Sequence, residues 1–440
     1  MWCLRIVGRW LRVKNRKRLL LIAPRFSYRI AAYIEAANSL AVNLHIASDG
    51  KNSLVSELAA GLHIDLDDID MTLAIILSRH KSEPFDAVIA SDDRTVAIAA
   101  NVAARLGLRC NPPETAQTSR RKDLSREALA HAGVSIPLFE KIALNGERKS
   151  PSKVGFPCVL KPLSLSASTG VIRADNSQQF AQACEQIRPI IAALPNDEEK
   201  THILVEQYVD GFEVAVEGLV TNNELIVLAI IDKPDPLTGP YFEETYYITP
   251  SRLDLRSQTR IKDLVAEACH ALGIITGPIH AELRINTDHC WILEVATRSI
   301  GGDCSRILQF IQPQSLEELV IANALDFDLP IDIGEAKAGK SAGVMMIPTP
   351  SSGILRRVEG LQLARRIAYI VSVDIAIRPG HELTRLPQGS SYLGFIFARA
   401  DTPDLVESAL RQAFACLRIE VAPLFFSTTA TTTTGSKSSG

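Results

Sequence analysis

The chain has 440 residues, more than one hydrophobic core usually holds, so several domains are expected. Its formal net charge of −3 gives no case for a nucleic-acid partner, and no apolar run is long enough for a transmembrane helix. The eight cysteines form no C-x-x-C pair, which indicates a reducing, cytoplasmic compartment and argues against a zinc site.

The amino-terminal end of the chain is rich in basic residues. The first 18 residues carry seven Lys or Arg side chains and no acid. A transit peptide, a membrane-surface helix and a start codon placed too far upstream would each give this pattern. We therefore predict that residues 1–17 are an extension outside the folded domains.

Short apolar strands then alternate with helical segments. The predicted strands are residues 19–23, 42–47 and 86–91. This alternation predicts a parallel sheet, and hence an α/β domain over residues 18–115. The segment lacks G-x-G-x-x-G, so nothing in it supports a dinucleotide site.

Two adjacent acids, Asp92 and Asp93, follow the third of these strands. Sheets of this class bind ligands at the carboxyl ends of their strands, so both acids are candidate ligand contacts. Capping of the next helix by one of them is the commoner explanation.

Residues 116–330 form the predicted central domain, with a lid subdomain at about 150–230. A helix is expected from Ser119 to His131, and Lys122 lies in its first turn, where a cation opposes the helix dipole. A bound phosphate would justify that placement, and a solvated lysine is the alternative.

A second lysine, Lys161, ends a predicted strand and precedes the hydroxyl-rich loop 162–170. Such a loop can cradle phosphate through its side chains and backbone N–H groups. A serine-rich surface loop is the alternative interpretation.

A meander of three strands is predicted next, over residues 203–209, 212–220 and 225–231. The loop 232–250 follows and carries Glu243 and Glu244. Long loops in compact domains are often lids or binding loops. From charge alone, either acid is a candidate for binding an ammonium group.

Residues 280–296 alternate polar and apolar side chains on both sides of a turn, which predicts a β-hairpin. A three-residue loop, 287–289, would place Glu282 directly across from Glu294. Like charges at that spacing repel, so the pair needs a cation, and Mg²⁺ is the natural one. Solvated acids on a surface hairpin are the alternative.

A fork-shaped donor and two glycines come directly after the hairpin. Arg298 can bind an anion through two parallel hydrogen bonds, and Gly301 and Gly302 let the backbone approach a ligand closely. Their position favours a ligand site over a solvated surface hairpin.

Residues 331–426 form a last predicted α/β unit. Residues 334–341 match the phosphate-loop pattern G-x-x-x-x-G-K-[ST], but a strand is predicted after them and Pro348 forbids the helix that this motif needs. We therefore interpret the match as accidental. The Ser/Thr/Gly-rich tail, 427–440, is expected to be disordered.

The chain resembles the ATP-grasp carboxylate–amine ligases over residues 18–424, and the L-amino acid ligases (dipeptide synthetases) in particular. The resemblance rests on Lys122 and on FPCVLKP, ILVEQYVDGFE, GPIHAELRI, WILEVATRSIGG and RPGHELTRLPQGSSYLGF, in that order. It implies an α/β (α+β ATP-grasp) fold. The expected parts are a parallel pre-ATP-grasp domain, an ATP-grasp core with an antiparallel lid, and a small carboxyl-terminal domain.

The resemblance also implies an ATP site. Two lysines would contact the phosphates, a small-residue loop would fold over them, a hinge would take the adenine, and an acid would accept the ribose hydroxyls. The residues that match these roles are Lys122, Lys161, Ser166, Ser168, Thr169, Gly170, Glu206, Gln207, Val209 and Glu213.

Metal and substrate contacts are implied in the same way. Glu282 and Glu294 match the acids that bind Mg²⁺, with Mn²⁺ as the alternative ion. Arg298 matches the arginine that, with Lys161, steadies the transferred phosphoryl group or the acyl intermediate. The substrate-contact candidates are Glu243, Glu244, His280, Arg298, Gly301 and Gly302.

Two positions depart from the family pattern. The phosphate loop is rich in serine and has Gly170 as its only glycine, so its phosphate contacts are expected to differ. Ala296 stands where this superfamily often has Asn, which removes a third metal ligand and leaves the number of ions open.

The implied reaction joins two small molecules. ATP would convert a carboxylate into an acyl phosphate, and an amine would displace the phosphate to form an amide. A homodimer is expected because many relatives are dimers. The alternatives are an enzyme that activates bicarbonate or another small acid, of the biotin-carboxylase or purine-pathway kind, and a non-catalytic ATP-binding module.

Overall fold

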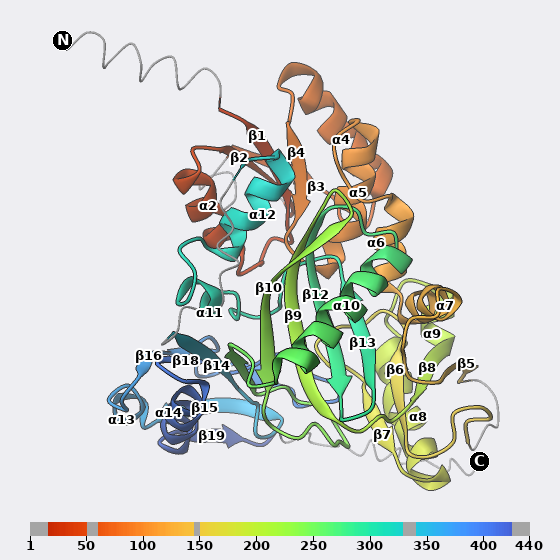
Figure 1. Cartoon of the computed structure of the whole chain (residues 1–440), viewed down its shortest axis with the longest axis vertical. Helices are drawn as coiled ribbons and strands as arrows, with labels where there is room; N and C mark the ends of the chain where they lie inside the picture. The colour runs from red at the N-terminus through yellow and green to blue at the C-terminus, as the bar shows by residue number, and fades with distance from the viewer. Residues whose placement is uncertain (1–15, 51–59, 145–149, 329–339, 425–440) are drawn as a thin grey trace, which may run out of the picture.

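The computed structural model describes residues 16–50, 60–144, 150–328 and 340–424. Three parts surround one large sheet, as Figure 1 shows: an amino-terminal domain in red and orange, a small sheet in yellow, and a carboxyl-terminal unit in blue. The predicted extension 1–17 lies almost wholly outside the described residues, and the predicted tail 427–440 lies entirely outside them.

The amino-terminal domain is the parallel α/β domain that the alternation predicts. Its sheet has the order β3-β2-β1-β4, and both partners of β1 run parallel to it. Helices cover both faces, so Leu19 to Ile22 of the central strand are fully buried. The elements are β1 (Arg18–Ile22), α2 (Ile30–Ser39), β2 (Asn43–Asp49), β3 (Ala60–Ile64), α4 (Ile69–Ser82), β4 (Ala87–Ala90) and α5 (Asp93–Arg105).

The central sheet is antiparallel and has eight strands in the order β13-β12-β9-β10-β11-β14-β18-β16. Five strands precede residue 300: β9 (Phe212–Thr221), β10 (Glu224–Lys233), β11 (Tyr246–Thr249), β12 (Gly277–Ile285) and β13 (Cys290–Ala296). Three belong to the carboxyl-terminal unit: β14 (Ser341–Ile347), β16 (Ile370–Ile375) and β18 (Gly394–Ala400). The predicted boundary at 330 therefore separates two parts that share one sheet.

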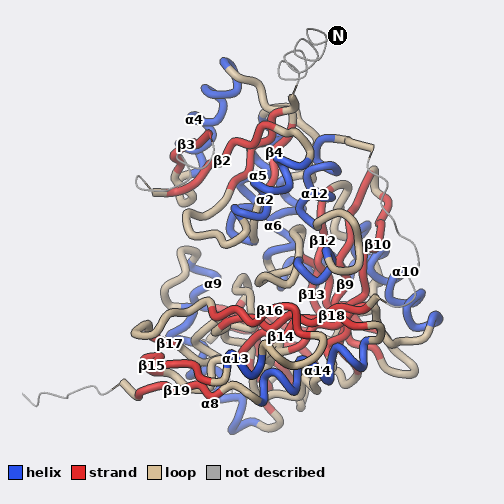
Figure 2. Tube along the Cα trace, turned by 90° about the vertical axis from the view of Figure 1, so that its left-hand side faces the viewer, coloured by secondary structure: helices blue, strands red, loops and turns tan. Residues whose placement is uncertain are grey.

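Helices cover both faces of this sheet. Helix α10 (Leu255–Ala271) packs on β9, β12 and β13, while α12 (Leu316–Leu325) lies between the sheet and α2 of the amino-terminal domain. Figure 2 shows that domain above the strands of the carboxyl-terminal unit. The remaining elements of the second half are α11 (Arg306–Gln309), β15 (Gly353–Glu359), α13 (Leu361–Ala364), β17 (Glu382–Leu383), α14 (Pro403–Ala415) and β19 (Arg418–Ala422).

The small sheet corrects the predicted meander. Its order is β5-β8-β6-β7, so the first predicted strand of the meander, β8, pairs with β5 and β6 and not with β9. The subdomain therefore ends near residue 207, and not near 230. Its elements are β5 (Phe139–Ala143), β6 (Cys158–Pro162), β7 (Ile172–Ala174), α8 (Ser177–Ile191), α9 (Asp197–Thr201) and β8 (His202–Gln207).

Two further local predictions were wrong. Helices α6 (Pro113–Arg120) and α7 (Lys122–His131) replace the single helix expected from Ser119, because Arg121 has extended backbone. The predicted loop 232–250 covers only residues 234–245, since β10 continues to Lys233 and β11 begins at Tyr246. Ser341 begins a strand, so no phosphate-loop helix follows it. Among the described residues, no helix has both the length and the apolar content to cross a membrane.

Gly211 lies in the segment between β8 and β9, and we predict that the substitution Gly211→Ala destabilises the protein. Gly211 has φ +150°, and a Cβ there would lie 2.7 Å from the Ile285 carbonyl oxygen. We expect a loss of about 2–3 kcal/mol in the free energy of unfolding, measured in urea. The control is Gly107→Ala, with φ +67° and nothing within 4 Å of the new Cβ, which should cost about 1 kcal/mol. Equal losses would contradict this account.

Candidate active site

The hairpin of β12 and β13 brings the two predicted metal acids together. Glu282 pairs directly with Glu294, as predicted. The route to this pairing differs from the prediction, because Ile285 pairs with Cys290 across a shorter turn and the register shifts between Glu282 and Leu283. This bulge adds one residue to β13 and moves Glu294 into line with Glu282.

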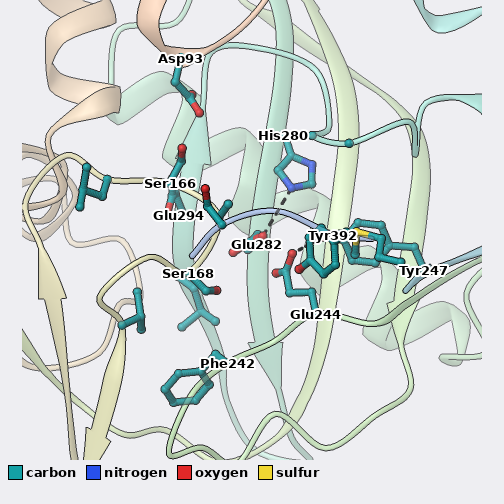
Figure 3. Close-up of a pocket in the computed structure, with 18 of the residues that line it drawn as sticks. Asp93, Ser166, Ser168, Phe242, Glu244, Tyr247, His280, Glu282, Glu294 and Tyr392 are labelled. Carbon is teal, nitrogen blue, oxygen red and sulfur yellow. Dashed lines mark hydrogen bonds and ion pairs between the residues drawn. The ribbon is translucent and has the colours of Figure 1, made fainter. Parts of the chain in front are cut away.

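A cavity of about 790 Å³ opens beside this hairpin, and all parts of the molecule contribute to its walls. Figure 3 shows Glu282, Glu244 and His280 directed into one region of it, with Glu294 and Ser166 in another. The predicted residues that line it are Lys122, Lys161, Ser166, Ser168, Glu206, Gln207, Val209, Glu213, Glu244, His280, Glu282, Glu294, Arg298, Gly301 and Gly302.

Three predicted residues do not line the cavity. The N–H group of Thr169 donates to the Ser166 carbonyl oxygen within the loop, at 3.2 Å. The N–H group of Gly170 donates to the Pro387 carbonyl oxygen of the carboxyl-terminal unit, at 2.8 Å. Glu243 is half-buried, and that burial raises the pKa of its carboxyl group, although nearby Arg385 opposes the shift.

Lys161 is held by a buried ion pair at one wall. Its Nζ lies 2.6 Å from Glu206, and Nε of Arg126 lies 2.6 Å from the other oxygen of the same carboxylate. Burial raises the pKa of Glu206, but the two cations outweigh it and hold the pKa below its ordinary value. Arg126 was not predicted. Its position one helical turn after Lys122 was the signal that it faces the same side.

Lys122 connects the phosphate loop to the hairpin. Its Nζ donates to the Leu165 carbonyl oxygen at 2.7 Å and lies 3.3 Å from Glu294. The lysine is therefore fixed between the loop expected to bind phosphate and an acid expected to bind the metal. This arrangement favours the phosphate-binding interpretation of Lys122 over a solvated lysine.

Lys233, which was not predicted from the sequence, lies at the centre of a cluster of predicted site acids. Its Nζ contacts Glu213 at 3.1 Å, Glu282 at 3.0 Å and also Glu244, and only 3% of the side chain is exposed. Burial lowers the pKa of Lys233, yet these carboxylates hold it well above the ordinary value. Burial and the neighbouring Glu282 raise the pKa of Glu244 to about 7.

These three carboxylates form a candidate cation site. One oxygen from each of Glu213, Glu244 and Glu282 lies within 4.8 Å of the others, a spacing that suits a divalent ion as well as an ammonium group. The pairing of Lys233 with Glu213 in the sheet register fixes the ammonium between them. Glu213, predicted to accept ribose hydroxyls, also accepts from Nε of Arg284 at 2.9 Å.

His280 adds a second buried cation. Its Nδ1 contacts Glu217, and its Nε2 lies 3.5 Å from Glu282. Burial lowers the pKa of His280, but Glu217 and Glu282 outweigh it and raise the pKa to about 9, so the imidazole is protonated at neutral pH. Glu217, which was not predicted, also accepts the N–H group of Ile300 at 3.2 Å.

Arg298 faces the cavity from the segment that follows the hairpin. Its Nε donates to Asp93 at 2.7 Å, and one terminal nitrogen donates to the Ser299 carbonyl oxygen at 3.0 Å. Gly301 and Gly302 line the cavity next to it. The cavity therefore combines fixed cations with a facing pair of carboxylates, which suits the binding of a polyphosphate together with a divalent ion.

Comparisons with known proteins agree with this geometry. Residues 154–307 match the family model described as an ATP-grasp domain, and residues 345–422 match the model described as L-amino acid ligase C-terminal domain 2. The chain is similar over 93% of its length to all of the crystal structure of an L-amino acid ligase from Bacillus licheniformis, with 25% identity and a TM-score of 0.78.

Two named relatives are similar to different shares of the chain. The chain is 26% identical over 265 residues to alanine–anticapsin ligase of Bacillus subtilis, a match that covers 56% of each chain. It is 23% identical over 379 residues to dapdiamide A synthase of Enterobacter agglomerans, which covers 81% of this chain and 82% of the relative. The chain thus spans about half of the first relative and most of the second.

The buried Glu206 ion pair predicts a specific stability loss. Glu206→Gln keeps the side-chain shape but leaves Lys161 and Arg126 as unpaired neighbouring cations. We expect the free energy of unfolding to fall by about 3 kcal/mol in a urea titration. The control, Glu198→Gln, removes an acid that is 42% exposed and should cost about 1 kcal/mol or less. A similar loss in both variants would contradict the account.

The variant Lys233→Met tests the carboxylate cluster. Without the ammonium group, the carboxylates repel, so their pKa values in the folded state rise above those of the unfolded chain. The stability that comes from protonating them is then lost as the pH rises through those values. We expect a loss of about 3 kcal/mol at pH 8, measured by urea unfolding, and partial recovery at pH 5.5.

The matched control is Lys141→Met, since Lys141 also contacts two acids but is 30% exposed. It should cost about 1 kcal/mol or less and show no recovery in acid. A pH-independent loss for Lys233→Met would rule out carboxylate repulsion as the cause.

Proposed function

The chain belongs to the ATP-grasp ligases, because it joins an ATP-grasp domain to an L-amino acid ligase carboxyl-terminal domain, and we propose that it forms an amide between two amino acids. In this proposal ATP converts the carboxylate of one substrate into an acyl phosphate. The amine of the other then displaces phosphate, and ADP is released. The observation that carries the proposal is the facing pair Glu282 and Glu294 among Lys122, Lys161 and Arg298.

The residues present fit a divalent ion. Glu282 and Glu294 supply hard oxygen ligands on neighbouring strands, and we propose that they hold Mg²⁺, with Mn²⁺ as the alternative. When bound, such an ion neutralises charge on the phosphates and polarises them. Ala296 offers no side-chain ligand, while the protein's own cation, Lys233, already contacts Glu282.

Phosphoryl transfer needs two anions to approach each other. Lys122 and Lys161 are placed to neutralise the phosphates of ATP, and Lys161 can leave Glu206 for a phosphate because both lie at the cavity wall. Arg298 is placed to steady the phosphoryl group that moves from ATP to the carboxylate. Fixed cations of this kind lower the barrier mainly by orientation and charge.

The second step needs a bound amine and a dry site. Of the two acids proposed for an ammonium group, Glu244 lines the cavity and Glu243 does not, so Glu244 is the better candidate. The hydroxyl group of Tyr247 donates to Glu244 and orients it. The N–H group of Gly170 in the loop 162–170 donates to the Pro387 carbonyl oxygen of the carboxyl-terminal unit, and in this proposal that contact holds the loop over the phosphates, where it excludes water that would hydrolyse an acyl phosphate.

Phosphate release from ATP and Mg²⁺ across a grid of amino acids, singly and in pairs, tests this function. We expect release that requires two amino acids, with a condensed product by mass spectrometry. Release with one acid and hydroxylamine would show activation of a carboxylate with a different natural amine. ATP binding without release from any acid would contradict the proposal and favour a binding module.

In the same assay, Glu282→Gln and Glu294→Gln should each lower the rate by about 100-fold or more, because each removes a metal ligand. Glu224→Gln makes the same change at an exposed position of the same sheet and should change the rate less than about twofold. Full activity in either hairpin variant would contradict the metal assignment. A homodimer and a cytoplasmic location stay predictions.

A further inference from the structure

The adjacent acids Asp92 and Asp93 have different partners. Asp92 caps helix α5, since its side chain accepts the N–H group of Arg94 and forms a capping box with Thr95. Asp93 is the first residue of that helix and accepts Nε of Arg298 at 2.7 Å. The capping interpretation made from the sequence is therefore confirmed for Asp92, whereas Asp93 lines the cavity and contacts Arg298.

The contact between Asp93 and Arg298 joins two parts of the molecule. Asp93 belongs to the amino-terminal domain, and Arg298 follows the hairpin of the central sheet. Arg29, also from the amino-terminal domain, donates to the carbonyl oxygens of Ser299 and Ile300. The segment that carries Arg298 is thus held at two points by a domain that supplies neither the hairpin acids nor the phosphate loop.

Arg298 would have other partners without Asp93. Glu294 and Glu217 also attract its guanidinium group. If the guanidinium group moved to Glu294, it would compete for an acid that the metal needs. With Asp93 on Nε and Ser299 on one terminal nitrogen, three N–H groups of the guanidinium group remain for an anion in the cavity.

We propose that Asp93 is a positioning residue that fixes Arg298 toward the transferring phosphoryl group and keeps it away from Glu294. This inference rests on the proposed role of Arg298 in phosphoryl transfer. Asp93 itself touches neither phosphate nor metal in this proposal. The amino-terminal domain would then contribute to the chemical step by orienting an arginine of the neighbouring domain.

The test is a double-mutant cycle on Asp93→Asn and Arg298→Ala. The ligand is ADP with Mg²⁺ and aluminium fluoride, which mimics the transferring phosphoryl group and needs neither the acid nor the amine. Calorimetry gives the affinity for this mimic and for ADP alone. We expect D93N to weaken binding of the mimic by about 10-fold to 100-fold and to leave the affinity for ADP unchanged.

The cycle separates positioning from a structural role. In the R298A background, D93N should change the affinity for the mimic by less than about twofold, because there is no guanidinium group left to orient. The control Asp67→Asn removes an exposed acid that pairs with Arg94 in the same domain and should change neither affinity. If D93N unfolds the protein, D93S replaces it, with the unchanged affinity for ADP as proof of folding.

An equal loss from D93N with and without Arg298 would overturn the proposal, as would full affinity for the mimic in D93N. If R298A itself binds the mimic normally, the positioning proposal also fails. Amide formation from two amino acids would in that case still support the ligase function, so the two failures are distinguishable.

Discussion

Charge balance inside one cavity is the constraint on which the site depends. Glu213, Glu244 and Glu282 bring three carboxylates close together, and in a partly buried site their mutual repulsion is much stronger than in water. The single ammonium group of Lys233 contacts all three. The protein thereby holds Glu282, which we propose as a ligand of a divalent ion, in place through its own cation. The cation nearest to Glu282 is thus Lys233, a residue of strand β10.

The same logic extends along the cavity. Lys122 lies 3.3 Å from Glu294, and Lys161 lies 2.6 Å from Glu206. In the proposed function, each of these two lysines has an internal anion that it can leave for a phosphate, so the anions neutralise the lysines when the site is empty and ATP replaces them when it binds. Such an exchange keeps the stability cost of an ATP site small and leaves the binding energy for the transferring group.

The hairpin could be predicted because polar and apolar side chains alternate along each of its strands, and this pattern is visible in the local sequence. Even in the hairpin, the pairing of Glu282 with Glu294 depends on a bulge that the local sequence pattern does not predict. Lys233 was missed because D-K-P-D-P is typical of a loop, whereas the strand ends directly before Pro234. Two features depend on packing between segments that are far apart in the chain: the place of β8 in the small sheet and the contact between Asp93 and Arg298. A local sequence pattern does not encode such packing.

The most direct test of the acyl phosphate follows the oxygen atoms. The acid substrate, labelled with ¹⁸O in its carboxylate, is incubated with ATP, Mg²⁺ and the amine, and the released phosphate is analysed by mass spectrometry. The account predicts one ¹⁸O atom in each phosphate, since the carboxylate oxygen stays with the phosphoryl group when the amine displaces it. Unlabelled phosphate formed alongside the amide, or ¹⁸O found in AMP, would contradict it.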